Sequence, residues 1–178
     1  KWILLGFIVI LLGCKSAKKA ISQEEFSTFK ETISNKEIDI EFDWAQPSGL
    51  LNNVSGLESI LPFGSTLSNI SLIGNANYLR IKKDSISMDI PYYGQQQLSG
   101  RYGSNQIGLF FKGVPEKFNE TFVEKNNKYI LKYWLDAKYE NLNIILFLFS
   151  NNKATLSVNS THRTTITYNG NWKPLKKA

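Results

Sequence analysis

The chain has 178 residues, a formal net charge of +6, one cysteine and one histidine. A single cysteine excludes an internal disulfide, and with a single histidine it excludes the Cys- and His-rich patterns of zinc sites, so we expect no metal and no cofactor. The sequence has no arginine-rich helix and no RNA-binding aromatic signature, so nucleic acid is not an expected partner.

The first segment is an apolar run from Trp2 to Leu12 that ends in Leu11-Leu12-Gly13-Cys14. The run is shorter than the roughly 20 apolar residues that a membrane-spanning helix needs, and its length suits a secretory leader. Its end resembles the lipobox of bacterial lipoproteins. This resemblance implies that residues 1–13 are a signal peptide and that Cys14 is lipidated, with diacylglycerol on the sulfur and an acyl chain such as palmitate on the amine.

Residues 14–21 are then the lipidated cysteine and a short tether. Stable anchoring needs two or more acyl chains, which a triacylated Cys14 supplies. The residue after Cys14 is Lys15, and not the aspartate that resembles an inner-membrane retention signal. We therefore expect a protein anchored in the cell envelope through lipid on Cys14, at the outer membrane, with its periplasmic or surface facing left open.

The next segment has the pattern of an amphipathic helix over residues 22–35. Ser22 and Glu25 form a capping box, and Ile21 and Phe26 occupy the positions of a hydrophobic staple. Apolar residues then recur at helical spacing up to Ile33. We expect this helix to cover part of a sheet.

From residue 36 the apolar period changes to two, which predicts a strand that runs from Ile38 to Trp44. Residues 48–68 have no strong period and are predicted to be a loop. Short strands follow, with Asn151-Asn152 at the position of a tight turn, and we expect them at 69–73, 76–83, 85–90, 107–112, 128–138, 143–149, 153–159 and 162–169. The fold class is therefore mainly β. We predict one domain, residues 22–178, with an antiparallel sandwich or barrel-like sheet of eight to nine strands and one N-terminal helix packed on it.

The order of these elements resembles the domain-of-unknown-function family numbered 4251, which contains envelope lipoproteins of Bacteroidota-type bacteria. The resemblance extends over residues 24–175 and implies an envelope lipoprotein without an assigned activity. It supplies no catalytic residues. The stretches that carry it are Asp43-Trp44-Ala45-Gln46-Pro47, residues 75–81, Asp89-Ile90-Pro91-Tyr92-Tyr93-Gly94, residues 108–111, and residues 160–170.

Two groups of polar residues invite a catalytic interpretation, and both have a simpler one. Asp39, Glu41 and Asp43 share a strand face, where they diverge and are expected to be solvated, opposite Arg80 or Lys82 across a strand pair. His162 lies among hydroxyl residues, but the sequence has no nucleophile elbow. We therefore expect no catalytic residues.

The polar, glycine-rich stretch from Gly94 to Gly103 is the expected rim of any ligand site. The candidate rim residues are Tyr92, Tyr93, Arg101, Tyr102 and Arg163. Adjacent aromatic residues on a strand point to opposite faces, so one member of each pair is expected to face outward. Arg163 suits either an anionic ligand or a structural salt bridge.

These observations favour a lipid-anchored envelope protein that is not an enzyme and that acts as a binding or interaction module. Its expected partners are the membrane, through Cys14, and an envelope protein, a glycan or an apolar ligand. The alternatives are an envelope hydrolase that acts on a glycan or an ester, and a structural lipoprotein without a small-molecule site.

Overall fold

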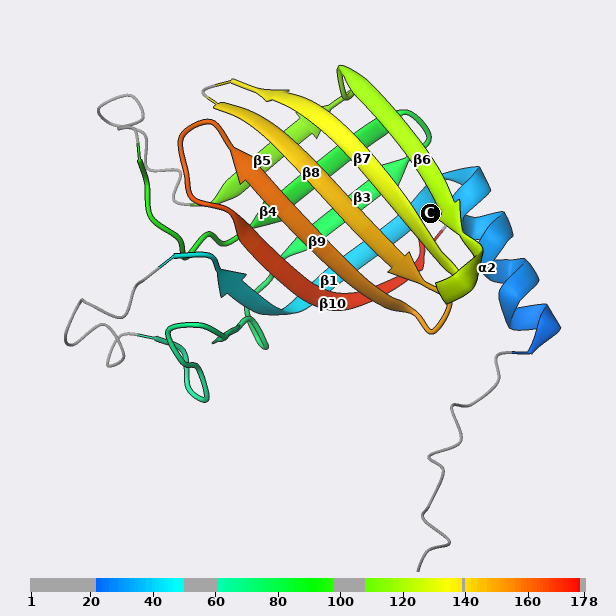
Figure 1. Ribbon diagram of the computed structural model, residues 1–178, viewed down its shortest axis with the longest axis horizontal. Coiled ribbons are helices and arrows are strands. Elements are labelled where there is room, and N and C mark those ends of the chain that lie inside the picture. Colours follow the sequence, from blue (N-terminus) through cyan, green and yellow to red (C-terminus); the bar gives the residue numbers. More distant parts are fainter. Residues whose placement is uncertain (1–21, 50–60, 98–107, 139, 177–178) are drawn as a thin grey trace, which may run out of the picture.

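The computed structural model describes residues 22–49, 61–97, 108–138 and 140–176 (Figure 1). These residues form one ten-stranded sheet, a helix and a short 3-10 helix. Within the sheet the strand order is β5-β4-β3-β1-β10-β9-β8-β7-β6, and β2 pairs with β1 outside this path. The elements are α2 (Gln23–Asn35), β1 (Glu37–Pro47), β2 (Ile70–Ser71), β3 (Tyr78–Lys82), β4 (Ser85–Ile90), β5 (Leu109–Gly113), β6 (Lys117–Val123), η4 (Glu124–Asn126), β7 (Lys128–Ala137), β8 (Glu140–Phe149), β9 (Lys153–Ser160) and β10 (Ile166–Pro174).

The sheet is antiparallel and curls into a half-barrel. In Figure 1 the strands β6 to β9 lie in front of β3 to β5, and β5 approaches β7 across the interior. The alternating residues of each strand that face inward are apolar and meet there; Ile40, Leu146 and Tyr168 are fully buried. The prediction of a mainly β domain with one N-terminal helix is confirmed. The sequence left a sandwich and a barrel-like sheet open, and the structure has a single sheet that curls into a half-barrel.

Helix α2 begins and ends as the sequence indicates. The Ser22 hydroxyl accepts a hydrogen bond from the Glu25 amide at 3.1 Å, and the Glu25 carboxylate accepts one from the Ser22 amide at 3.0 Å. An N-cap of this kind contributes about 1 kcal/mol. The Phe29 ring is buried, with its centroid 5.4 Å from that of Tyr129 and 5.3 Å from that of Trp172. These contacts fix the helix at one end of the half-barrel (Figure 1).

Three strand predictions need correction. Strand β6 (Lys117–Val123) was not predicted, because this edge strand has only two aromatic residues on its inner face and, apart from Val123, is otherwise polar. The last strand runs over Ile166–Pro174 and not over 162–169, because residues 162–165 turn back to bond with residues 95–97. Strand β2 is only Ile70–Ser71, since it pairs with β1 at two positions.

Adjacent aromatic residues do point to opposite faces of the sheet. On β5, Phe110 is 46% exposed while Phe111 is 6% exposed. On β7, Tyr133 is buried in the interior and Trp134 lies on the outer face, partly exposed. This alternation follows from the period of two along a strand, and it leaves aromatic side chains on the outer face of the sheet.

Two buried tyrosines differ in how their hydroxyl groups are satisfied. The Tyr168 hydroxyl donates to the Pro91 carbonyl at 2.9 Å, whereas the Tyr133 hydroxyl has no hydrogen-bond partner among the described residues. Burial raises the pKa of both phenols above the ordinary value of 10.0, so both stay protonated at neutral pH.

We expect Tyr133→Phe to raise the free energy of unfolding by about 1 kcal/mol, because it removes a buried polar group that makes no bond. Tyr168→Phe is the matched control and is expected to lower it by about 1 kcal/mol, since the Pro91 carbonyl loses its donor. Urea unfolding of both variants measures the two changes. Equal destabilisation by both substitutions would contradict the prediction.

Candidate functional site

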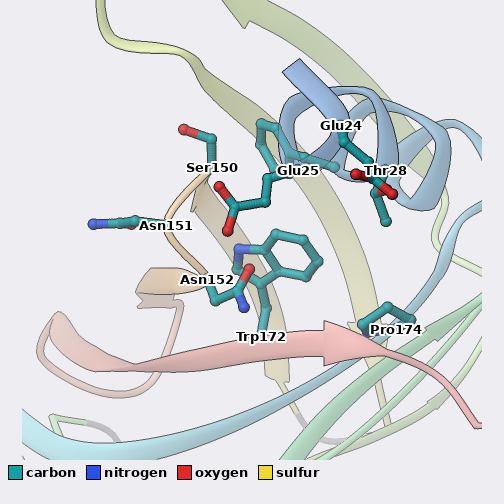
Figure 2. Close-up of a pocket in the computed structure, with 9 residues that line it drawn as sticks. Glu24, Glu25, Thr28, Ser150, Asn151, Asn152, Trp172 and Pro174 are labelled. Carbon is teal, nitrogen blue, oxygen red and sulfur yellow. The ribbon is translucent and has the colours of Figure 1, made fainter. Parts of the chain in front are cut away.

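A pocket of about 560 Å³ opens between the start of α2 and the turn that joins β8 to β9 (Figure 2). Ligand pockets in proteins commonly have volumes of about 300–1,000 Å³, so this one is large enough for a small molecule. We call it the α2 pocket. Its lining residues are Glu24, Glu25, Thr28, Phe29, Ser150, Asn151, Asn152, Trp172 and Pro174.

The floor of the α2 pocket is aromatic and rigid. Trp172 comes from β10, and its indole N–H donates to the Phe149 carbonyl at 2.7 Å. The indole ring lies against Phe29 of α2, with an angle of 35° between the ring planes. Both side chains are almost fully buried, with exposures of 4% for Trp172 and 1% for Phe29. The floor is therefore held in place by packing and by a hydrogen bond before any ligand arrives.

One wall of the α2 pocket is the β8–β9 turn. Asn152 adopts a left-handed backbone conformation, with φ 63°, which asparagine tolerates better than most residues. Its amide donates to the Phe149 carbonyl at 3.1 Å, and its carbonyl accepts from the Trp172 amide at 2.8 Å. The Asn151 side-chain oxygen accepts from the Lys153 amide at 3.3 Å. The backbone of this wall is thereby fixed, and it presents one hydroxyl and two amide side chains.

The opposite wall is the first turns of α2. Glu24 and Thr28 are one helical turn apart and lie on the same side of the helix. Figure 2 shows the Glu25 side chain of α2 and the Asn152 side chain of the β8–β9 turn near the same end of the Trp172 indole. Carboxylate, hydroxyl and amide groups therefore face an apolar floor, an arrangement that can hold a ligand with both polar and apolar surface.

The sequence does not predict the α2 pocket, although two parts of the pocket are visible in it. The capping box placed Glu24 and Glu25 at the start of a helix, and Asn151-Asn152 was recognised as a turn. Nothing local shows that these segments meet, because 125 positions separate Glu25 from Ser150. Only the pairing of β10 with β1 and β9 brings them together at Trp172.

The predicted rim lies at the other end of β9 and β10. The Arg163 guanidinium bonds the Glu140 carboxylate at 3.0 Å and the Gly108 carbonyl at 3.2 Å, and it lies 5.0 Å from the centre of the Tyr92 ring. The Ser160 hydroxyl donates to the same carboxylate. Of the two uses considered for Arg163, the structure places it in a salt bridge.

Tyr92 fixes the same region from the other side. Its hydroxyl lies 2.8 Å from the Thr164 carbonyl and 3.0 Å from the Gln95 carbonyl, and burial raises its pKa. Tyr93 is partly exposed and packs against the core. The structure thus unites two of the five predicted rim residues. Arg101 and Tyr102, like the proposed lipidation site Cys14, lie outside the described residues.

The other polar residues that the sequence singled out are held in separate places. Asp39 bonds Arg80 across the β1–β3 pair at 2.9 Å, as predicted, and also lies 3.5 Å from the Lys173 ammonium. Asp43 accepts from Asn171 at 2.9 Å. The His162 ring bonds the Thr161 hydroxyl at 2.8 Å. Asp39 and Asp43 of β1 therefore make separate pairs with residues of the neighbouring strands.

Two further properties concern the described part of the chain. No three His, Cys, Asp or Glu side chains within it are grouped closely enough to hold a metal ion. No helix within it has the length and hydropathy that crossing a membrane requires.

Comparison with known proteins identifies a family and a fold. The model of the domain-of-unknown-function family DUF4251 matches residues 20–172. A crystal structure of a DUF4251 family protein from Bacteroides eggerthii DSM 20697 superposes with a TM-score of 0.56 at 12% identity, over 85% of this chain and 88% of that chain. No curated protein matches this chain. Since the family model spans most of the sequence and the half-barrel recurs in a solved relative, the chain belongs to the DUF4251 family.

Proposed function

We propose that this protein is a lipid-anchored binding module of the bacterial cell envelope and that the α2 pocket takes a sugar unit of a glycan. The apolar run that ends in Leu11-Leu12-Gly13-Cys14 supports the anchor and the outer-membrane address. The observation that carries the binding role is the α2 pocket itself, in which polar side chains surround an aromatic floor.

The chemistry of the lining favours a sugar over a purely apolar ligand. A sugar ring combines C–H patches with several hydroxyl groups, each of which both donates and accepts. Glu24, Thr28, Ser150 and the two asparagines supply acceptors and donors on both walls, and Trp172 lies beneath them. A lipid chain has no groups that could bond these side chains, whereas the hydroxyl groups of a sugar can both donate to them and accept from them.

The same lining supports binding without hydrolysis. Glycosidases usually place two carboxyl groups on opposite sides of the scissile bond. Here Glu24 and Glu25 are consecutive residues of one helical turn, and the Glu25 carboxylate accepts the Ser22 amide in the capping box. The two carboxylates therefore do not enclose a bond between them, and we assign the pocket a binding role.

Glycan binding can be tested with the chain from Ser22 to Ala178, which contains every element that the structure describes. We expect at least one saccharide in an array of bacterial mono- to tetrasaccharides to bind this chain. Isothermal titration calorimetry then measures the affinity for that saccharide. Glu24→Ala and Ser150→Ala each remove one polar contact and are expected to weaken binding about tenfold.

Glu31→Ala is the matched control, because Glu31 lies on the same exposed helix but outside the pocket lining. It is expected to leave the affinity unchanged. Failure of every glycan to bind, or equal affinity in the Glu24→Ala variant and the unmodified chain, would refute the proposed ligand class.

A further inference from the structure

Strand β8 departs from the alternation that strands such as β1 and β9 follow on the outer face of the sheet. An antiparallel sheet with one solvated face alternates apolar residues inside with polar residues outside. Strand β1 does so with Asp39 and Glu41, and β9 with Thr155 and Ser157. On β8, however, the outward residues Ile145, Phe147 and Phe149 are also apolar.

Neighbouring strands extend this apolar surface. Ile130 of β7 stands directly opposite Phe147 in the register of the sheet. The outward apolar side chains of β7 and β8 are partly exposed, and in Figure 1 none of the described elements lies in front of β6 to β8. We call this surface the apolar outer face, and it consists of Val123, Ile130, Trp134, Ile145, Phe147 and Phe149.

Lysines alternate with the apolar side chains of this face. Lys117 is opposite Trp134, Lys132 is opposite Ile145, and Lys128 is opposite Phe149 in the register. The Lys128 ammonium lies 5.0 Å from the Phe147 ring centre and 5.8 Å from the Phe149 ring centre. Apart from Asp136, the outward side chains of β6 to β8 in the described part of the chain carry no negative charge.

From this pattern we infer that the apolar outer face docks on the surface of an anionic bilayer. Aromatic and aliphatic side chains with interspersed lysines combine apolar burial with attraction to anionic headgroups, as interfacial protein surfaces do. A protein partner would have to match three lysines with acidic groups of its own, whereas a bilayer presents them everywhere.

The inference rests on the proposed lipid anchor, which would bring the bilayer within reach. Cys14 lies eight positions before Ser22, and a chain of that length spans at most about 28 Å. The helix that follows packs against the inner face of β6, where the Phe26 and Phe122 ring centres are 6.2 Å apart. An anchored domain would therefore have the β6 edge of the sheet, which borders the apolar outer face, close to the membrane.

The test uses the chain from Ser22 to Ala178, which lacks Cys14 and the lysines next to it. In sedimentation with vesicles, we expect it to bind vesicles rich in phosphatidylglycerol several times more strongly than pure phosphatidylcholine, with binding reduced by salt. The double variant Ile145→Thr/Phe147→Thr is expected to weaken binding at least tenfold, and Lys132→Glu about fivefold.

Strand β5 offers matched controls on the other half of the sheet. Phe110→Thr and Lys112→Glu change an exposed aromatic residue and an exposed lysine outside the apolar outer face, and both are expected to bind as the unmodified chain does. Circular dichroism verifies the fold of each variant. If the double threonine variant does not fold, Lys132→Glu and Lys128→Glu decide the question, because both reverse a charge and leave the apolar side chains of this face in place.

Equal binding of all variants, absence of binding to phosphatidylglycerol, or a dimer that Ile145→Thr/Phe147→Thr dissociates would overturn the inference. The anchor is tested separately by fractionating cells that carry the full chain with Cys14→Ala, combined with Ile145→Thr/Phe147→Thr and Lys132→Glu so that docking through the apolar outer face cannot retain it. Release of this variant from the membrane, compared with the same chain that keeps Cys14, supports the anchor, and full retention refutes it, whatever the vesicles show. The two failures are therefore distinguishable.

Discussion

Replacing Gly170 with alanine is expected to lower the free energy of unfolding by about 3 kcal/mol or more. A Cβ at this position would lie 2.1 Å from the Glu41 carbonyl oxygen and 2.5 Å from the Phe42 Cα. Both obstacles are backbone atoms of the neighbouring strand, so no side chain can rotate away. The clash can be relieved only by separating β1 from β10.

This pair of strands is sensitive because it lies near the middle of the sheet and contains a bulge. The register of β1 against β10 shifts between Phe42, which pairs with Gly170, and Trp44. On the other edge of β1, the Asn77 side chain accepts from the Phe42 amide at 2.9 Å and donates to the Phe42 carbonyl at 3.0 Å. The Phe42 backbone is thus held from both sides, and it has no room to yield.

Urea unfolding followed by circular dichroism measures the effect, and Gly113→Ala is the control. A Cβ at Gly113 would meet only the Phe111 ring, at 3.5 Å, which is ordinary contact. We expect that substitution to change stability by less than about 1 kcal/mol. A small effect at Gly170, comparable to that at Gly113, would contradict the packing described for the bulge.

Replacing Arg163 with methionine is expected to lower the free energy of unfolding by about 3 kcal/mol, because the Glu140 carboxylate then stays largely buried without a cation beside it. The two side chains are 13% and 11% exposed and lie 3.0 Å apart. Arg163 also bonds the Gly108 carbonyl and lies over Tyr92, so its loss loosens three segments together. Urea unfolding at neutral pH gives the change.

Arg80→Met is the matched control, since it removes the same kind of side chain from the Asp39 pair on the surface. Arg80 is half exposed in that pair, and exposed ion pairs contribute at most about 1 kcal/mol. Adding Glu140→Gln to Arg163→Met is expected to restore part of the lost stability, because no buried charge then remains. If Arg163→Met and Arg80→Met lowered the free energy of unfolding equally, the Arg163–Glu140 pair would not stabilise the fold as a buried ion pair.

The sequence predicted best where one local pattern determines the structure. The Ser22–Glu25 capping box predicted the start of α2, and the alternation from Ile38 onward predicted β1. Arg80 was one of the two partners predicted for Asp39, because only a few cationic residues lie on the outward face of the strands near β1. Strand β6 escaped prediction because an edge strand buries little, and its sequence therefore alternates weakly.

The candidate sites show the limit of local patterns. The rim prediction united Tyr92 and Arg163 but missed Glu140, which starts a strand whose apolar pattern begins only at Leu142. The strand predicted over 143–149 is β8, which lies inside the sheet, but the sequence did not show that its outer face stays uncovered by the described elements. The α2 pocket was missed altogether.

The sequence by itself determined the helix, most strands and the mainly β class, because hydrophobic period and capping act over a few residues. It also supplied the lipobox resemblance on which the proposed address depends. Tertiary structure alone decided that the strands form one curled half-barrel, that Arg163 pairs with Glu140, and that α2 meets the β8–β9 turn over Trp172. Twist, bulges and strand order fix these contacts, and they are properties of the whole sheet, set by pairings between residues far apart in the chain.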